Sequence, residues 1–182
     1  MLFEPIEAHI PSEYLVKLAI DPWELRDAQK LRRAVFCHEQ AIFVHDDRDA
    51  IDEIATTIVA LSCIAGQPDQ VVGTVRIHED PARPGVWCGS RLAVHASFRR
   101  VSRIGTALIR LAVCTAHARS CHTFLAHVQK QNVPMFELLH WRSLQEVVLH
   151  GRPHHFMQAD LAHYPPFSAG EAGFVVTGKI AA

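Results

Sequence analysis

The chain has 182 residues, 49% of them hydrophobic and 20% charged, with a formal net charge of -1. This length suits one domain with a sizeable core, and the balanced charge gives no sign of a general nucleic-acid or anionic-membrane binder. No apolar run reaches the ~20 residues that span a bilayer, and the N-terminus lacks the basic and apolar segments of a signal peptide. Five cysteines without a C-x-x-C spacing predict a reduced, cytoplasmic protein with no metal site.

The N-terminal half is predicted to contain a strand, a long helix and then three more strands. Asp21 and Pro22 form a strong helix start, because Asp caps free N–H groups and Pro suits the first helical position. Apolar residues spaced near 3.6 carry this helix to Glu39–Gln40. The predicted strands span 14–20, 56–65, 71–78 and 86–94, with an acidic loop or short helix over 41–53.

The C-terminal half is predicted to alternate helices and strands before an irregular end. A helix over 103–119 is followed by a strand over 123–129. Asn132 can cap a second helix that extends to Trp141. Strands are predicted over 143–149 and 155–161. Residues 165–182 are rich in turn-forming residues and are interpreted as an irregular tail or linker stub, which leaves 1–164 as the domain.

The most informative segment is 91–109, where an apolar strand leads through a short basic loop into a helix. The start of a helix exposes unpaired N–H groups and a partial positive charge, which suits a phosphate group. Arg99, Arg100 and Arg103 add full charges beside it. Gly105 leaves room for a ligand to approach the backbone. The alternative is an ordinary strand–turn–helix junction with a solvated arginine cluster.

This segment resembles motif A of the GCN5-related N-acetyltransferases (GNAT), which binds the pyrophosphate of acetyl-CoA. Leu92 and Val94 match its strand positions, Arg100 its leading basic residue and Gly105 its second glycine. Arg103 stands where the first glycine is usual, and the loop is one residue longer. The resemblance implies an α/β (α+β) GNAT fold, with a mixed, mostly antiparallel sheet of about six to seven strands flanked by about four helices.

Three further segments carry the resemblance. Residues 31–40 are similar to the first-helix signature of a subset of these enzymes, and also to a run in acyl-homoserine lactone synthases. Residues 128–141 resemble a late family segment, with Phe136 where a tyrosine is usual, and 151–157 resemble the closing hairpin. More narrowly, the chain resembles a small acetyltransferase-like family encoded beside nitrilases in bacterial gene clusters.

The resemblance implies an acyl-CoA-dependent N-acetyltransferase with acetyl-CoA as cosubstrate. A small amine would be the second substrate, and dimers are common in the family. A backbone N–H near Val94 is the implied donor to the oxyanion. The implied cofactor-binding residues are Leu92, Ala93, Val94, Arg99, Arg100, Val101, Ser102, Arg103, Ile104, Gly105, Thr106, Gln129 and Phe136.

Proton transfer is where the sequence departs from the family. Residues 86–94 lack the carboxylate that the family often places there, and Phe136 cannot donate a proton as tyrosine does. The amine must lose a proton before it attacks, so we expect a base. Glu39 is the first candidate, because the first helix lines the acceptor side in the family, and His127 and Glu79 follow. Each has an ordinary alternative as a helix-end carboxylate, a satisfied core histidine and a solvated turn residue, respectively.

Two other functions stay open. The missing carboxylate and tyrosine favour a non-catalytic acyl-CoA-binding or regulatory module. The run in 31–40 alone favours an enzyme similar to acyl-homoserine lactone synthases, which would need a site for S-adenosylmethionine. The acidic run at 46–49 either attracts a cationic amine or is a solvated loop.

Overall fold

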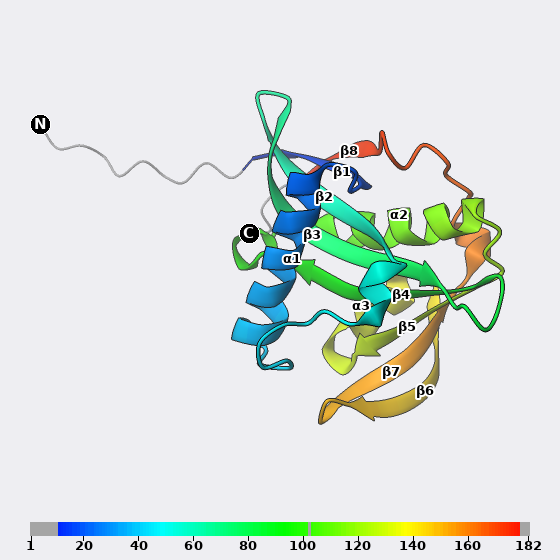
Figure 1. Ribbon diagram of the computed structural model, residues 1–182. Coiled ribbons are helices and arrows are strands. Elements are labelled where there is room, and N and C mark those ends of the chain that lie inside the picture. The colour runs from blue at the N-terminus through cyan, green and yellow to red at the C-terminus, as the bar shows by residue number, and fades with distance from the viewer. Residues whose placement is uncertain (1–10, 102, 179–182) are drawn as a thin grey trace, which may run out of the picture.

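The computed structural model describes residues 11–101 and 103–178, and within these ranges eight strands form one sheet (Figure 1). The strand order is β6-β7-β5-β4-β3-β2-β1-β8. The strands are β1 (Glu13–Leu18), β2 (Thr56–Ile64), β3 (Gln67–Glu79), β4 (Val86–Val94), β5 (Thr123–Gln129), β6 (Trp141–Leu149), β7 (Arg152–Ala159) and β8 (Phe174–Thr177). The α-helices are α1 (Pro22–Arg33), α2 (Ile104–Ala118) and α3 (Val133–Leu138), and a π-helical segment, η1 (Ala34–Glu39), extends α1.

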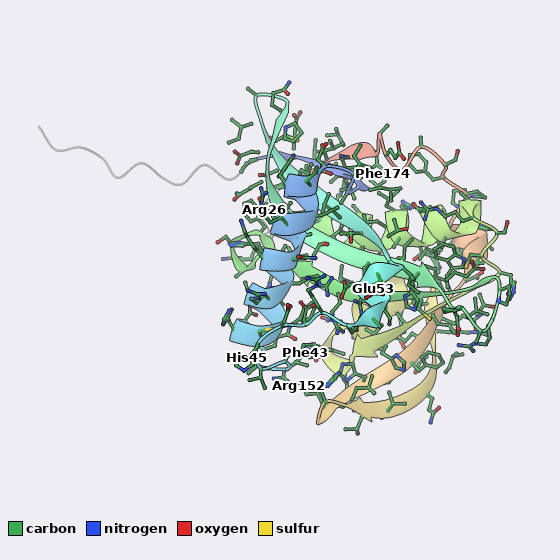
Figure 2. The ribbon with its side chains drawn as sticks, in the orientation of Figure 1. Arg26, Phe43, His45, Glu53, Arg152 and Phe174 are labelled. Atoms are coloured by element: carbon green, nitrogen blue, oxygen red, sulfur yellow. The ribbon has the colours of Figure 1, made fainter. Side chains whose placement is uncertain are left out.

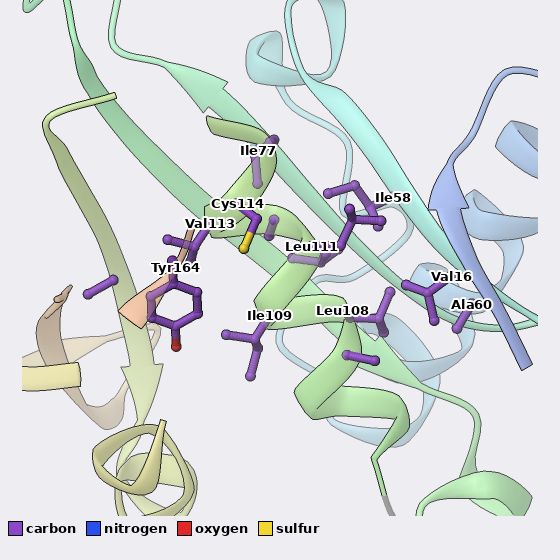
Figure 3. Packing of buried hydrophobic residues seen from close by; sticks show 14 of the residues in the cluster. Val16, Ile58, Ala60, Ile77, Leu108, Ile109, Leu111, Val113, Cys114 and Tyr164 are labelled. Atoms are coloured by element: carbon purple, nitrogen blue, oxygen red, sulfur yellow. The ribbon is translucent and has the colours of Figure 1, made fainter. Parts of the chain in front are cut away.

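The sheet is covered on both faces, by α1 on one and by α2 on the other. Alternation along β2 shows this, because Ile58 and Ala60 belong to the cluster packed around α2 while Val59 and Leu61 pack with α1. Figure 3 shows the α2 side, where Leu108 and Leu111 lie among the strands. Burial on both faces explains why the central strands read as continuous apolar runs rather than as alternating patterns.

The fold class implied by the sequence is confirmed, as is the order of the main elements. The predicted ranges for β4 and β5 agree with the observed ones, and the long first helix ends at Glu39 as a π-helix. Asp21 caps α1, and Glu24 accepts a hydrogen bond from the Asp21 N–H at 3.2 Å. The counts differ: the described residues contain eight strands and three α-helices.

Two elements depart from the prediction in the C-terminal half. α3 stops at Leu138 because His140 adopts a positive φ of 62°, and Trp141 then begins β6 instead of ending the helix. The predicted irregular tail contains β8, which pairs antiparallel with β1 through Tyr14 and Val176. A four-residue strand gives too short an alternation to be recognised from sequence.

β4 and β5 are parallel neighbours that separate partway along their length. Their register runs from Val86↔Thr123 to Gly89↔Ala126 and stops there. Beyond this point β5 continues to pair only with β7, while β4 continues along β3. The sheet is therefore split between the end of β4 and the end of β5.

Candidate active site

A cavity of about 270 Å³ lies at the split and reaches both faces of the sheet. Its wall is mainly apolar, with a few polar groups, as is common for small-molecule sites. β4 and β5 contribute Gly89, Ser90, Arg91, Leu92, Phe124, Ala126, His127, Val128 and Gln129. The α2 face contributes Ile109, Ala112, Asn132, Phe136 and Trp141, and the α1 face contributes Phe36, Gln40, Ile42, Phe43, Leu149, His150 and His154.

The backbone of β4 beyond Gly89 faces the split without a strand partner on that side. Arg91 has a positive φ of 55° and marks a bulge, since Arg76 pairs with Ser90 while Thr74 pairs with Ala93. The His95 N–H donates to the Val72 carbonyl at 2.8 Å, so the adjacent pair Val94↔Gly73 is a non-hydrogen-bonded pair. The Val94 carbonyl therefore faces away from β3, where Arg99 Nε donates to it at 2.9 Å. The N–H and carbonyl of a strand residue point the same way, so the Val94 N–H also faces the split. This fits the oxyanion donor implied near Val94.

In the motif A loop, a left-handed residue precedes α2 even though the expected glycine is missing. Arg103, at the usual glycine position, has a φ of 85° and is the N-cap of α2. A glycine would adopt this left-handed conformation without strain. A Cβ built on Gly105 meets no atom within 4 Å, so the first turn of α2 is open to a ligand. The loop therefore fits a pyrophosphate at the start of the helix.

The other implied cofactor residues that the structure describes occupy three kinds of position. Leu92, Gln129 and Phe136 line the cavity. Ala93, Val101 and Ile104 are buried in the two cores, where their side chains hold the loop and helix in place. Arg100, Arg103 and Thr106 retain solvent contact beside the start of α2, whereas Ser102 lies outside the described residues.

Glu39 and Arg99, predicted as a base and a phosphate ligand, bind each other. Arg99 Nη1 and Nη2 donate to the two oxygens of Glu39 at 2.5 and 2.6 Å. The hydrogen bond from Arg99 lowers the pKa of Glu39, and the same bond raises the pKa of Arg99. The pair ties the end of η1 to motif A. A carboxylate with a lowered pKa is a weaker proton acceptor than a free one.

His127 lies at the cavity together with His154, which was not among the bases predicted from the sequence. The pairs His127↔Phe156 and Gln129↔His154 place these side chains on the α1 face. The His127 ring stacks on Phe156 at 4.7 Å. Partial burial, with a contribution from His154, lowers the pKa of His127. No spacing in the sequence joins residues 127 and 154, because only the pairing of β5 with β7 brings them together.

His154 is buried and its neighbour fixes which nitrogen carries the proton. Nδ1 lies 2.9 Å from the carbonyl oxygen of Arg152, which can only accept. The neutral ring therefore carries its hydrogen on Nδ1 and a lone pair on Nε2. Glu79, the third predicted base, lies at the other end of β3, where it accepts a hydrogen bond from the Gly85 N–H at 2.6 Å. It does not line the cavity.

The acidic loop is anchored to the sheet by a network of ion pairs. Arg32 Nε donates to Asp47 at 2.7 Å, and the Arg32 side chain is only 3% exposed. Asp47 and its neighbours therefore face arginines, which removes the basis for attraction of a cationic substrate by this run. The network consists of Arg32, Arg76 and Arg91 with Asp47, Asp49 and Asp52. The acidic run at 46–49 is visible in the sequence, but Asp52 and the three arginine partners, which come from α1, β3 and β4, were not predicted.

Contacts between the loop after η1 and the β6–β7 hairpin narrow the cavity on the α1 face. Gln129 Nε2 donates to Gln40 Oε1 at 2.9 Å, and Arg152 donates to the Gln40 carbonyl. The rings of Phe43 and His150 meet edge to face at 5.1 Å. Figure 2 shows Phe43 and Arg152 close together where the loop and the hairpin approach each other. The α1 side of the cavity is thus assembled from distant segments.

The split between β4 and β5, beside a left-handed turn and the start of α2, agrees with the acyl-CoA site that the sequence resemblance implies. The sequence pattern of the Acetyltransferase (GNAT) family matches residues 16–141, which is more than half of the chain. The chain belongs to this family, whose members transfer acyl groups from acetyl-CoA or another acyl-CoA as cosubstrate. Its closer resemblance to the nitrilase-cluster family stays a prediction.

Solved structures share the fold at low identity. A proposed N-acetyltransferase from Lactobacillus plantarum matches with a TM-score of 0.69 and 21% identity, covering 80% of this chain and 97% of that chain. Escherichia coli ElaA matches with a TM-score of 0.67 and 18% identity over 81% and 98%. The structure of the NatC complex bound to Gag peptide and CoA matches with a TM-score of 0.59 and 14% identity over 80% and 97%.

No curated protein matches this chain in sequence. Among the described residues, no helix is long and apolar enough to cross a membrane.

Proposed function

We propose that the protein is an N-acyltransferase that moves an acetyl or longer acyl group from acyl-CoA to a small amine by direct attack. The observation that carries this proposal is the cavity at the split, where unpaired β4 backbone and the histidines of β5 and β7 meet. Acyl-CoA would enter along motif A, and the amine from the α1 face. The cytoplasmic location and a homodimer stay predictions.

The reaction forms a bond between the amine nitrogen and the thioester carbon and breaks the carbon–sulfur bond. The ammonium must first give its proton to a base, because only the neutral amine carries a lone pair. Negative charge then develops on the carbonyl oxygen, and we assign the Val94 N–H as the donor that stabilises it. The electron pair of the broken bond leaves with CoA as a thiolate.

His127 and His154 fit the base better than Glu39 does. His127 has a lowered pKa, so its ring is neutral at pH 7 and can accept a proton. The lone pair on Nε2 of His154 offers a second acceptor in the same wall. Glu39 instead has both oxygens bound by Arg99. We keep Glu39 as a positioning residue that fixes Arg99 and, through it, the Val94 carbonyl.

No tyrosine lines the cavity among the described residues, and Phe136 packs edge to face on Trp141 at 5.0 Å. Tyr164 is buried and donates its hydroxyl to the Leu139 carbonyl while it accepts from Trp141 Nε1. The thiolate therefore leaves without a phenolic acid, which is tolerable because a thiol has a pKa of about 8.5.

The test is release of CoA thiol from acetyl-, butyryl- and octanoyl-CoA with a mixture of primary amines, with the acylated products identified by mass spectrometry. We expect amine-dependent thiol release and an N-acyl product. A melting-temperature rise with CoA but no release with any amine would contradict the proposal and support the non-catalytic binder instead. Stabilisation by S-adenosylmethionine alone would favour the lactone-synthase alternative.

A further inference from the structure

The wall of the cavity contains no carboxylate among the residues that the structure describes. Its titratable groups are Arg91 and the three histidines at 127, 150 and 154. Asp47 and Asp49, which accept hydrogen bonds from Arg91, are not part of the wall. An acceptor with a second ammonium group would therefore lose hydration there without meeting an opposite charge.

The Arg91 guanidinium is held in place by hydrogen bonds from two of its three nitrogens. Nε donates to the Asp47 carboxylate at 3.0 Å and Nη2 donates to Asp49 at 3.2 Å. The guanidinium lies 4.5 Å from the centroid of the Phe43 ring, and the side chain is 17% exposed. Nη1 makes no hydrogen bond to any residue in the described ranges. A fixed guanidinium loses little conformational entropy when it binds a ligand.

The chemistry that suits this nitrogen is a carboxylate. Guanidinium groups bind carboxylates through charge-assisted hydrogen bonds, and burial strengthens the bond relative to water. The rest of the α1 face of the cavity includes the apolar side chains of Ile42, Phe43 and Leu149. These would accept an apolar or aromatic group.

We propose that the acceptor is an amino acid with an apolar side chain, whose carboxylate is bound by Arg91 while its amine is acylated. The inference rests on the proposed function and names the substrate class of the same site. His127 or His154 takes the proton of the amine, and Arg91 orients the other end of the molecule. Arg91 acts here as a binding residue and takes no part in proton transfer.

The test compares L-phenylalanine with L-phenylalaninol, which keeps the amine and the ring but replaces the carboxylate with a neutral hydroxymethyl group. We expect kcat/KM for phenylalanine to exceed that for phenylalaninol by about tenfold or more, the range for a charged hydrogen bond. In Arg91→Gln this ratio should fall to about one, and Arg91→Lys should give an intermediate value. A ratio is independent of the folded fraction, so partial unfolding does not obscure the result.

Two control variants separate ligand binding from damage to the ion-pair network. Arg76 belongs to the network without lining the cavity, and Arg33 forms an exposed pair with Asp46. Arg76→Gln and Arg33→Gln should both keep the wild-type ratio. A lowered ratio in Arg76→Gln equal to that in Arg91→Gln would overturn the inference, because the network as a whole would then set the preference.

The outcomes distinguish the inference from the proposed function. A wild-type ratio at or below one, or spermidine as the preferred acceptor, overturns the inference and leaves the N-acyltransferase intact. A phenylalanine-to-phenylalaninol ratio that is unchanged in Arg91→Gln also overturns the inference and leaves the N-acyltransferase intact. Absence of acylation of phenylalanine, phenylalaninol, phenethylamine and spermidine overturns the proposed function, and the inference fails with it.

Discussion

The two sides of the split are built in opposite ways. The cosubstrate side comes from one stretch of chain, from Leu92 on β4 to Thr106 in the first turn of α2. The acceptor side is assembled from the π-helix, the loop after it, the bulge at Arg91 and the β6–β7 hairpin. The geometry of a contiguous motif is set by its local backbone conformation. The acceptor wall of the cavity depends instead on the entire sheet and on the contacts between its separate segments.

The two sides also differ in how they carry charge. Around motif A, Arg99 is paired with Glu39, while Arg100 and Arg103 are exposed beside the start of a helix, where positive charge can meet an anion. On the acceptor side Arg32 and Arg76 are buried and matched by aspartates, so their role is to hold the loop in place. Changes on the first side should therefore alter binding, and changes on the second should alter stability first.

The largest effect is expected from Gly105→Glu, on the cosubstrate side. The new side chain has space and an acidic residue in the first turn favours the helix, so the melting temperature should hold. A carboxylate at this place repels the pyrophosphate, and the Kd for CoA should rise about a thousandfold, or ~4 kcal/mol. Isothermal titration measures it, with Gly105→Ala as the control of near-normal affinity. If Gly105→Glu leaves the affinity for CoA unchanged, the pyrophosphate does not bind at this turn.

The next effect is expected from Asp52→Asn, on the acceptor side. Asp52 is bound by Arg32 at 2.5 Å and by Arg76 at 2.7 Å, so its loss leaves buried charge uncompensated. The free energy of unfolding should fall by about 3 kcal/mol, measured with urea. The control is Asp27→Asn, which removes an exposed pair with Lys30 and should cost less than about 0.5 kcal/mol. Equal losses in the two variants would show that burial of the network contributes nothing.

Asp52→Asn should also show over which pH range the Asp52 carboxylate stabilises the fold. Burial alone would raise the pKa of Asp52, but hydrogen bonds from Arg32, the Asp49 N–H and Arg76 outweigh it and lower the pKa. The carboxylate therefore stabilises the fold above its unfolded pKa of about 4 and loses this contribution as the pH falls toward the folded value. The difference in unfolding free energy between wild type and Asp52→Asn should be constant near neutrality and shrink below about pH 4. If the difference in unfolding free energy between wild type and Asp52→Asn increases below about pH 4, the pKa of Asp52 is not lowered in the folded protein.

The cosubstrate side and the acceptor side also differ in how much of them could be predicted from the sequence. The cosubstrate side could be proposed from the sequence because Leu92, Val94, Arg100 and Gly105 stand at fixed spacings within one short segment. Arg103, which stands where the resemblance places a glycine, has a positive φ of 85°, a conformation that a glycine would adopt without strain. The element order was also predictable, because helical and strand periodicities are properties of short windows.

The acceptor side could not be predicted because its contacts join residues far apart in the chain. His127 and His154 meet through strand pairing, and Gln40 meets Gln129 across 89 positions. Glu39 appeared free in the sequence, yet Arg99 binds it from 60 positions away. Identifying such partners requires the sheet order and register, which depend on the packing of the complete domain.

An intermediate effect is expected from His127→Gln, which removes a proposed proton acceptor without removing its size. At pH 8, kcat/KM should fall about a hundredfold while CoA affinity stays normal. Because the lowered pKa keeps the ring neutral down to below about pH 6.5, the ratio of wild-type to variant activity should be largest above that pH and shrink below it. His154→Gln is the matched variant, and a loss confined to it would assign the base to His154.

The smallest effect, and the sharpest test of the cosubstrate side, is expected from Arg103→Gly. Relief of the left-handed strain at φ 85° should raise the free energy of unfolding by about 0.5–1 kcal/mol, after allowance for the greater freedom of glycine in the unfolded chain. Loss of the guanidinium should at the same time weaken CoA binding about threefold, because a solvated charge beside a phosphate contributes little. Arg103→Ala separates the two effects, since it removes the charge but keeps a Cβ in the strained conformation. It should therefore share the weaker binding without the gain in stability. If Arg103→Gly instead lowers stability, the side chain holds the loop through its own contacts, and the position is not a glycine site that happens to carry arginine.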